Sequence, residues 1–151
     1  MIIGDPSQFA IWFDEVRSWS TQTISNGCLA YIAQEEIVPR LPFSSTIGAD
    51  IVSMSHFQCL TRAIGDGRVA EMSKEDAFSI LYSRAFPNEE SADENDFSHL
   101  VSPYSFRDAG HIFFLSQGRE EDRILFGPHG EPGEVKELRR SEEHTSELQS
   151  H

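Results

Sequence analysis

The chain has 151 residues, of which 12 are basic and 25 acidic, so its formal net charge is −13 at pH 7. This balance argues against binding to nucleic acid and to anionic membrane surfaces, because both attract basic proteins. With 38% hydrophobic residues the chain carries enough apolar mass to fold, and no apolar run approaches the roughly 20 residues that span a membrane.

The first forty residues predict antiparallel strands separated by turns. Residues 4–7 read as a turn, since Pro fixes φ and Asp bonds to nearby amides. Residues 9–19 fit both strand alternation and a helical stripe, and their aromatic and β-branched content favours a strand. The Asn26-Gly27 pair predicts a turn into a second strand over residues 28–33, and a short strand follows at residues 37–38.

The middle of the chain predicts a further strand and two helices. Residues 46–52 read as the strand, and a first helix is expected to begin near Ser53 or Ser55 and to end at Gly65. Ser73 is a good N-cap for the second helix, and Pro87 stops it. The apolar stripe of that helix comprises Ala77, Phe78, Leu81, Tyr82 and Ala85.

The carboxyl-terminal part predicts an acidic loop followed by strands. Residues 88–96 carry five carboxylates and no basic side chain. Residues 111–115 and 123–126 read as an antiparallel pair, and residues 135–138 begin a last strand. Strands at both ends with helices between them predict an α+β fold, in which two central helices pack on one face of an antiparallel sheet.

The last twelve residues, Arg140–His151, match the translation of a widely used sequencing adapter without a mismatch. We therefore expect residues 1–139 to form a single, C-terminally truncated domain and residues 140–151 to be an artefactual, disordered tail. Removing this segment, with its one basic and three acidic residues, changes the net charge from −13 to −11.

Catalytic and metal-binding motifs are not found. The sequence has no CxxC pair, no HExxH, no GxSxG and no phosphate loop, so we predict no catalytic residue, no metal and no cofactor. Cys28 and Cys59 lie in apolar stretches and are expected to be free, buried thiols. A zinc ligand pair of Cys28 with His56, and a Cys59 nucleophile beside His56, are weaker alternatives.

Two other functions stay open as alternatives. The first is a small enzyme whose site is assembled in space from His56, His99 or His111 with Asp50 or Asp108. Such an enzyme needs a deep pocket with converging polar groups. The second is a scaffold subunit, which would expose an unusually large apolar patch.

The segments MIIGDPSQFAIWFDEVRSW and NGCLAYIAQEEIVP resemble the start of the immunity protein 42 family, and FRDAGHIFFLSQGREEDRILFG looks like that family's carboxyl-terminal hairpin. The GDP opening, formed by Gly4, Asp5 and Pro6, and the Phe-Ala-Ile strand carry the likeness. The resemblance implies a cytoplasmic protein that binds and neutralises a cognate bacterial toxin domain without catalysis. It transfers no catalytic residues.

Acidity suits an inhibitor of a basic toxin such as a nuclease, because carboxylates can occupy a groove built for phosphates. The acidic loop is the partner-binding candidate, and its competing interpretation is a solvated linker. The candidate residues are Glu89, Glu90, Asp93, Glu94 and Asp96.

Overall fold

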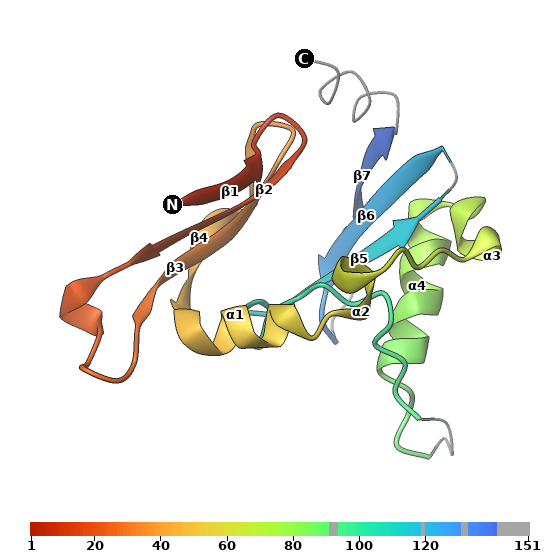
Figure 1. Ribbon diagram of the computed structural model, residues 1–151. Helices are drawn as coiled ribbons and strands as arrows, with labels where there is room; N and C mark the ends of the chain where they lie inside the picture. Colours follow the sequence, from red (N-terminus) through yellow and green to blue (C-terminus); the bar gives the residue numbers. More distant parts are fainter. Residues whose placement is uncertain (91–93, 119, 131–132, 142–151) are drawn as a thin grey trace. The chain divides into compact units, whose positions relative to one another are not determined.

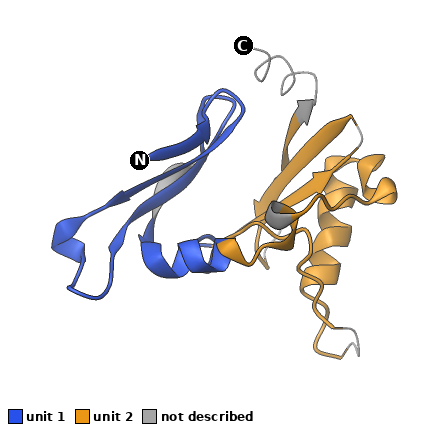
Figure 2. Ribbon diagram, in the orientation of Figure 1, with its two compact units in different colours: residues 1–54, 103–109 blue, residues 55–102, 110–151 orange. Residues whose placement is uncertain are grey.

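The computed structural model divides the chain into two compact units that alternate along the sequence (Figures 1 and 2). Unit 1 comprises residues 1–54 and 103–109, and unit 2 comprises residues 55–102 and 110–151. The expectation of a single domain over residues 1–139 stays a prediction. The structure describes residues 1–90, 94–118, 120–130 and 133–141.

Unit 1 is built on a four-stranded antiparallel sheet in which each strand pairs with its neighbour in sequence (Figure 1). The turn after the first strand is fixed by Ser7, whose N–H and hydroxyl donate to the Asp5 carboxylate at 2.9 and 2.7 Å. The elements are β1 (Ile2–Asp5), β2 (Phe9–Glu15), the 3-10 helix η1 (Arg17–Trp19), β3 (Asn26–Ala33) and β4 (Glu36–Thr46).

Two helices of unit 1, α1 (Ile47–Ser55) and α5 (Tyr104–Asp108), contact this sheet, α1 through the bond between Asp50 and Ser45 and α5 through the ring of Phe106. The ring of Tyr31 on β3 is 2% exposed and contacts Phe106 edge-on, with ring centroids 4.7 Å apart. The same ring contacts Phe9 of β2 at 5.1 Å. Aromatic contacts of this geometry stabilise a core beyond simple burial. They bring residues 103–109 into unit 1 despite their distance in sequence.

A buried carboxylate ties the helices of unit 1 to the sheet. Asp50 of α1 is 2% exposed. It accepts hydrogen bonds from the hydroxyl of Ser45 at the end of β4 and from the N–H of Ser105 in α5, the latter at 3.1 Å. Because a buried charge is costly unless it is hydrogen-bonded, these two donors are needed where Asp50 lies.

Unit 2 combines a three-stranded antiparallel sheet with helices. Its sheet is β5 (His111–Gln117), β6 (Glu121–Pro128) and β7 (Lys136–Ser141), and its helices are α2 (Gln58–Thr61), α3 (Gly67–Ala70) and α4 (Lys74–Ala85). Phe78 of α4 contacts the ring of Phe114 on β5 at 5.4 Å. Gly127 on β6 leaves room for it, since a Cβ there would lie 2.9 Å from the Phe78 ring. The packing of α4 on the sheet forms the core of the unit.

Helix α4 forms as predicted from local signals. The side chain of Ser73 accepts a hydrogen bond from the N–H of Asp76 at 3.2 Å, which caps the first turn. Glu75 and Asp76 complement the positive end of the helix dipole. The buried stripe comprises Ala77, Phe78, Leu81 and Ala85.

The α+β class is confirmed, and the strands form two sheets. The strand predicted at residues 46–52 is wrong, because that segment continues into α1 and its helical course places Asp50 against its two donors. The helix predicted from Ser53 to Gly65 reduces to the four-residue α2. The turn predicted at Asn26-Gly27 is also wrong, since both residues begin β3.

Strand β7 extends to Ser141, and the backbone of Arg140 pairs with Asp122 on β6. Residues 142–151 of the predicted tail lie outside the described residues. Within the described part of the chain, no helix has the length and apolar character needed to cross a membrane.

Candidate functional site

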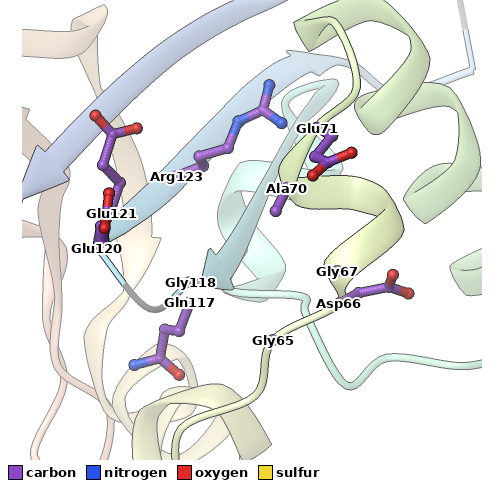
Figure 3. A pocket seen from close by; sticks show the side chains of 10 residues that line it. All are labelled: Gly65, Asp66, Gly67, Ala70, Glu71, Gln117, Gly118, Glu120, Glu121 and Arg123. Atoms are coloured by element: carbon purple, nitrogen blue, oxygen red, sulfur yellow. The ribbon is translucent and has the colours of Figure 1, made fainter.

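A cleft of about 590 Å³ lies in unit 2 between α3, with the segment that leads into it, and the β5–β6 turn (Figure 3). Four of its side chains are carboxylates and one is a guanidinium, so its lining is acidic. Gly67 adds no side chain to it, and a Cβ there would have no neighbour within 4 Å. The lining residues are Gly65, Asp66, Gly67, Ala70, Glu71, Gln117, Gly118, Glu120, Glu121 and Arg123.

Asp66 is held at the rim of this cleft by three donors. Its carboxylate accepts the N–H groups of Arg68 and Val69 at 2.9 and 3.3 Å, which caps α3. Its second oxygen accepts a hydrogen bond from Arg84 of α4 at 2.8 Å. The bond from Arg84 is the main cause that lowers the pKa of Asp66, so this carboxylate stays ionised near neutral pH.

Arg123 of β6 is the buried cation of the cleft, with 3% of its surface exposed. Its guanidinium donates to the carbonyl of Val69 and to the Glu137 carboxylate, both at 2.6 Å. Glu137 also accepts a bond from Arg139, which reaches Glu121 at 2.9 Å. Burial alone would raise the pKa of Glu137, but the bonds from the two arginines outweigh it and the pKa falls.

Two carboxylates of the cleft are ion-paired and two are not. Asp66 and Glu121 are ion-paired with Arg84 and Arg139. Glu71 and Glu120 are exposed and form no ion pair with the described residues. The charge of these two carboxylates is therefore not neutralised by an ion pair.

The predicted acidic loop follows α4, and its described carboxylates are exposed: Glu89, Glu90, Glu94 and Asp96. Asp93 lies outside the described residues. The far end of the loop is fixed to α4, since the N–H of Asp96 donates to the carbonyl of Arg84 at 2.8 Å. Hydrogen bonds from Ser98 lower the pKa of Asp96, and the charge of Arg84 contributes.

Arg84 thus connects the two acidic features of unit 2. Its guanidinium binds Asp66 of the cleft, and its carbonyl accepts from Asp96 of the loop. The loop is recognisable in the sequence as a run of carboxylates. The cleft is not, because Asp66 and Glu120 are 54 positions apart, and only the two glycines that flank Asp66 mark one side of it.

A protein-family model described as Immunity protein 42 matches residues 1–148 of the chain. The chain belongs to the immunity protein 42 family. It is also similar to a solved structure, the crystal structure of CdiI from Burkholderia dolosa AUO158, with 35% sequence identity and a TM-score of 0.84. That comparison covers 98% of this chain and 95% of that chain. No curated protein matches the chain. Its function is that of an immunity protein, which neutralises a toxin.

The histidines considered for an enzyme site in this immunity protein have separate surroundings. His99 is 6% exposed, and its Nδ1 lies 2.9 Å from the carbonyl of Leu115. Burial lowers the pKa of His111, and His56 is exposed. Asp50 is engaged by its two donors in unit 1.

Both cysteines of this immunity protein are free thiols, as predicted, but the prediction that both are buried is correct only for Cys59. Cys59 is buried, and burial raises its pKa to about 11, which disfavours the reactive thiolate. Cys28 is half-buried. No group of three His, Cys, Asp or Glu side chains within the described ranges is placed to hold a metal ion.

Proposed function

We propose that this immunity protein acts in the cytoplasm by binding one cognate toxin domain directly, as a stoichiometric inhibitor without catalysis. The family match over residues 1–148 is the observation that carries the proposal. The protonation and burial of Cys59, and the engagement of Asp50 and His99 by buried backbone and hydroxyl groups, also favour binding over catalysis.

We further propose that the toxin presents a basic surface, such as the nucleic acid groove of a nuclease, to the acidic side chains of unit 2. The net charge of −13 and the exposed carboxylates of the loop support this. Opposite charges increase the association rate by long-range attraction, and carboxylates in a phosphate groove exclude the substrate. The proposed contact residues are the loop residues Glu89, Glu90, Asp93, Glu94 and Asp96, with Glu71 and Glu120 of the cleft.

Co-expression with the toxin domain encoded by the neighbouring gene tests the binding function. Cells that express the toxin domain alone should stop growing, and cells that also express this chain should grow. The two proteins should then co-purify. Growth arrest despite full expression of the folded chain would overturn the proposal.

The acidic surface has its own matched test. Glu89→Gln with Glu90→Gln removes two adjacent exposed charges from unit 2, and Glu35→Gln with Glu36→Gln removes two adjacent exposed charges from unit 1. The first pair should lower the association rate several-fold, which corresponds to a rise of at most about 1 kcal/mol in the activation free energy of association. It should also weaken the dependence of that rate on salt. The second pair should leave the association rate and its dependence on salt close to those of the wild type. Equal effects of the two pairs would contradict a role for the loop.

A further inference from the structure

One face of the sheet in unit 1 carries large apolar side chains, opposite the face on which Tyr31 contacts Phe106 of α5. Cross-strand partners in an antiparallel sheet point to the same side. The register pairs Ile2 with Trp12 across β1 and β2, and Ile32 with Ile37 across β3 and β4. Ala10 pairs with Ile32 and places both sets on one side. We call this surface the apolar face: Ile2, Trp12, Ile32 and Ile37.

The apolar face is accessible although its residues are hydrophobic. Ile2 is 51% exposed and Ile37 is 43% exposed, while Trp12 and Ile32 are half-buried. Tyr31 and Ser45, which contact the helices of unit 1, lie on the opposite side of the sheet because side chains alternate along a strand. A cluster of partly exposed apolar side chains that includes a tryptophan is typical of a protein-binding surface.

Trp12 is the aromatic side chain of this face. Asp14, two residues along the same strand, lies on the same side of the sheet, and its carboxylate accepts a bond from the amino group of Met1 at 2.7 Å. A tryptophan side chain has only two rotatable bonds, so it offers a large contact area at a small cost in conformational entropy. It is therefore suited to anchor a partner.

The edge strand β1 adds hydrogen-bonding groups beside the apolar face. Met1 and Phe13 exchange two backbone bonds, at 2.7 and 2.9 Å. Hydrogen-bonded and non-hydrogen-bonded pairs alternate in an antiparallel ladder, so the backbone N–H and C=O of Ile2 point away from β2. An extended segment of a partner can pair with these groups while its side chains contact Ile2 and Trp12.

We propose that the apolar face is a docking surface for the cognate toxin, with Trp12 as its anchor. The inference rests on the proposed function, which supplies the partner. A second copy of the chain fits less well, because two molecules of charge −13 repel and each would bring its exposed Asp14 into the contact. A basic toxin is attracted by the same charges. Burial on the apolar face then slows dissociation, whereas the acidic side chains of unit 2 speed association.

The test is a neutral double substitution, Ile2→Thr with Ile37→Thr, which keeps β-branched side chains in both strands. Its control, Ile51→Thr with Val52→Thr, makes the equivalent change on α1, where the two residues are 46% and 58% exposed. Binding kinetics to the toxin domain from the neighbouring gene should show about a tenfold faster dissociation for the first variant. This effect should be the same at low and high salt, and the control should dissociate like wild type.

The proposal would be overturned if the wild type binds the toxin domain and the folded double variant dissociates from it at the same rate as the wild type. Failure of the wild type to bind would instead overturn the proposed function. A concentration-dependent dimer of the wild type that the double variant abolishes would assign the face to a second copy.

Fluorine NMR tests the same face without the double substitution, in case the double variant does not fold. Fluorotryptophan incorporated into the otherwise wild-type chain gives two resonances, from Trp12 and Trp19, which Trp19→Phe assigns. Adding the unlabelled toxin domain should shift the Trp12 resonance. A complex in which that resonance does not move would contradict the assignment.

Discussion

The acidic surface of unit 2 and the apolar face of unit 1 differ in the range over which they act. The carboxylates around the cleft and loop act through a field that reaches about a Debye length and is screened by salt. The side chains around Trp12 act only on contact, through the removal of apolar surface from water. A small inhibitor can thus use different parts of its fold for fast association and for slow dissociation.

The two units also differ in the partners that stabilise their buried charged side chains. Asp50 is the buried carboxylate among the described residues of unit 1, and its hydrogen-bond donors are neutral. Unit 2 holds a buried arginine, Arg123, with a carboxylate and a carbonyl. Removal of the partner from a buried ion pair costs about 3–5 kcal/mol, whereas the loss of one hydrogen bond to a charged group costs about 1.5–3 kcal/mol. The arrangement in unit 2 should therefore be the more sensitive to substitution.

The largest expected effect is that of Arg123→Met. This substitution leaves Glu137 and the carbonyl of Val69 without their buried donor, and should lower the free energy of unfolding by about 3–5 kcal/mol. Urea denaturation measures it. Arg139→Met removes an exposed arginine from the same network and should cost less than about 1 kcal/mol. Equal costs would show that burial does not distinguish the two arginines.

The next prediction contrasts the two faces of the sheet in unit 1. Phe106→Ala removes a fully buried ring of α5 that packs on Tyr31 at one face of the sheet, and should lower the free energy of unfolding by about 3–4 kcal/mol. Ile37→Thr, on the apolar face, should cost less than about 1 kcal/mol, because this side chain is already 43% exposed. Thermal and urea unfolding compare them. A similar loss for both would mean that the apolar face is part of the core.

A smaller effect concerns pH and Asp66. The pKa of Asp66 is lowered from its ordinary value of 3.8 in the folded state, so its contribution to stability is present above pH 3.8 and is lost as the pH falls through the folded pKa. Asp66→Asn should remove this part of the acid dependence, worth about 1 kcal/mol or less. Arg84→Met should remove the same part, because Arg84 is its main cause. Additive effects in the double variant would contradict the coupling.

The smallest expected effect is the change in the stability of the protein when the acidic loop is neutralised. Neutral substitution of Glu89, Glu90 and Glu94 should change the free energy of unfolding by less than about 0.5 kcal/mol, because these side chains are exposed. The same variant should associate more slowly with the toxin. Loss of stability comparable to the loss of binding would assign the loop a structural role.

The sequence predicts those parts of the fold whose signals are local. The cap at Ser73 and the stripe behind it define α4, and the apolar residues of β5 and β6 define a hairpin. The sequence predicts a strand in place of α1 because Ile47, Ile51 and Val52 favour strands on average, whereas the contact of Asp50 with Ser105 comes from a segment 55 residues away.

The candidate surfaces also differ in whether their residues are neighbours in the sequence. The acidic loop is visible as a run of carboxylates. The cleft and the apolar face are assembled from separate segments, and only the strand register brings Ile2 beside Trp12 and Ile37 beside Ile32. Single residues such as Trp12 give no sign of which side of a sheet they will occupy until the pairing is known.

A titration of toxin activity with purified chain tests the central claim most directly. The toxin domain is held at a fixed concentration well above the dissociation constant, and increasing amounts of the chain are added. We predict that activity falls linearly and reaches zero near one equivalent, because inhibition requires a bound complex. Complete loss of activity at a small fraction of an equivalent would indicate catalysis, and activity that persists at excess would show that the chain does not neutralise this toxin.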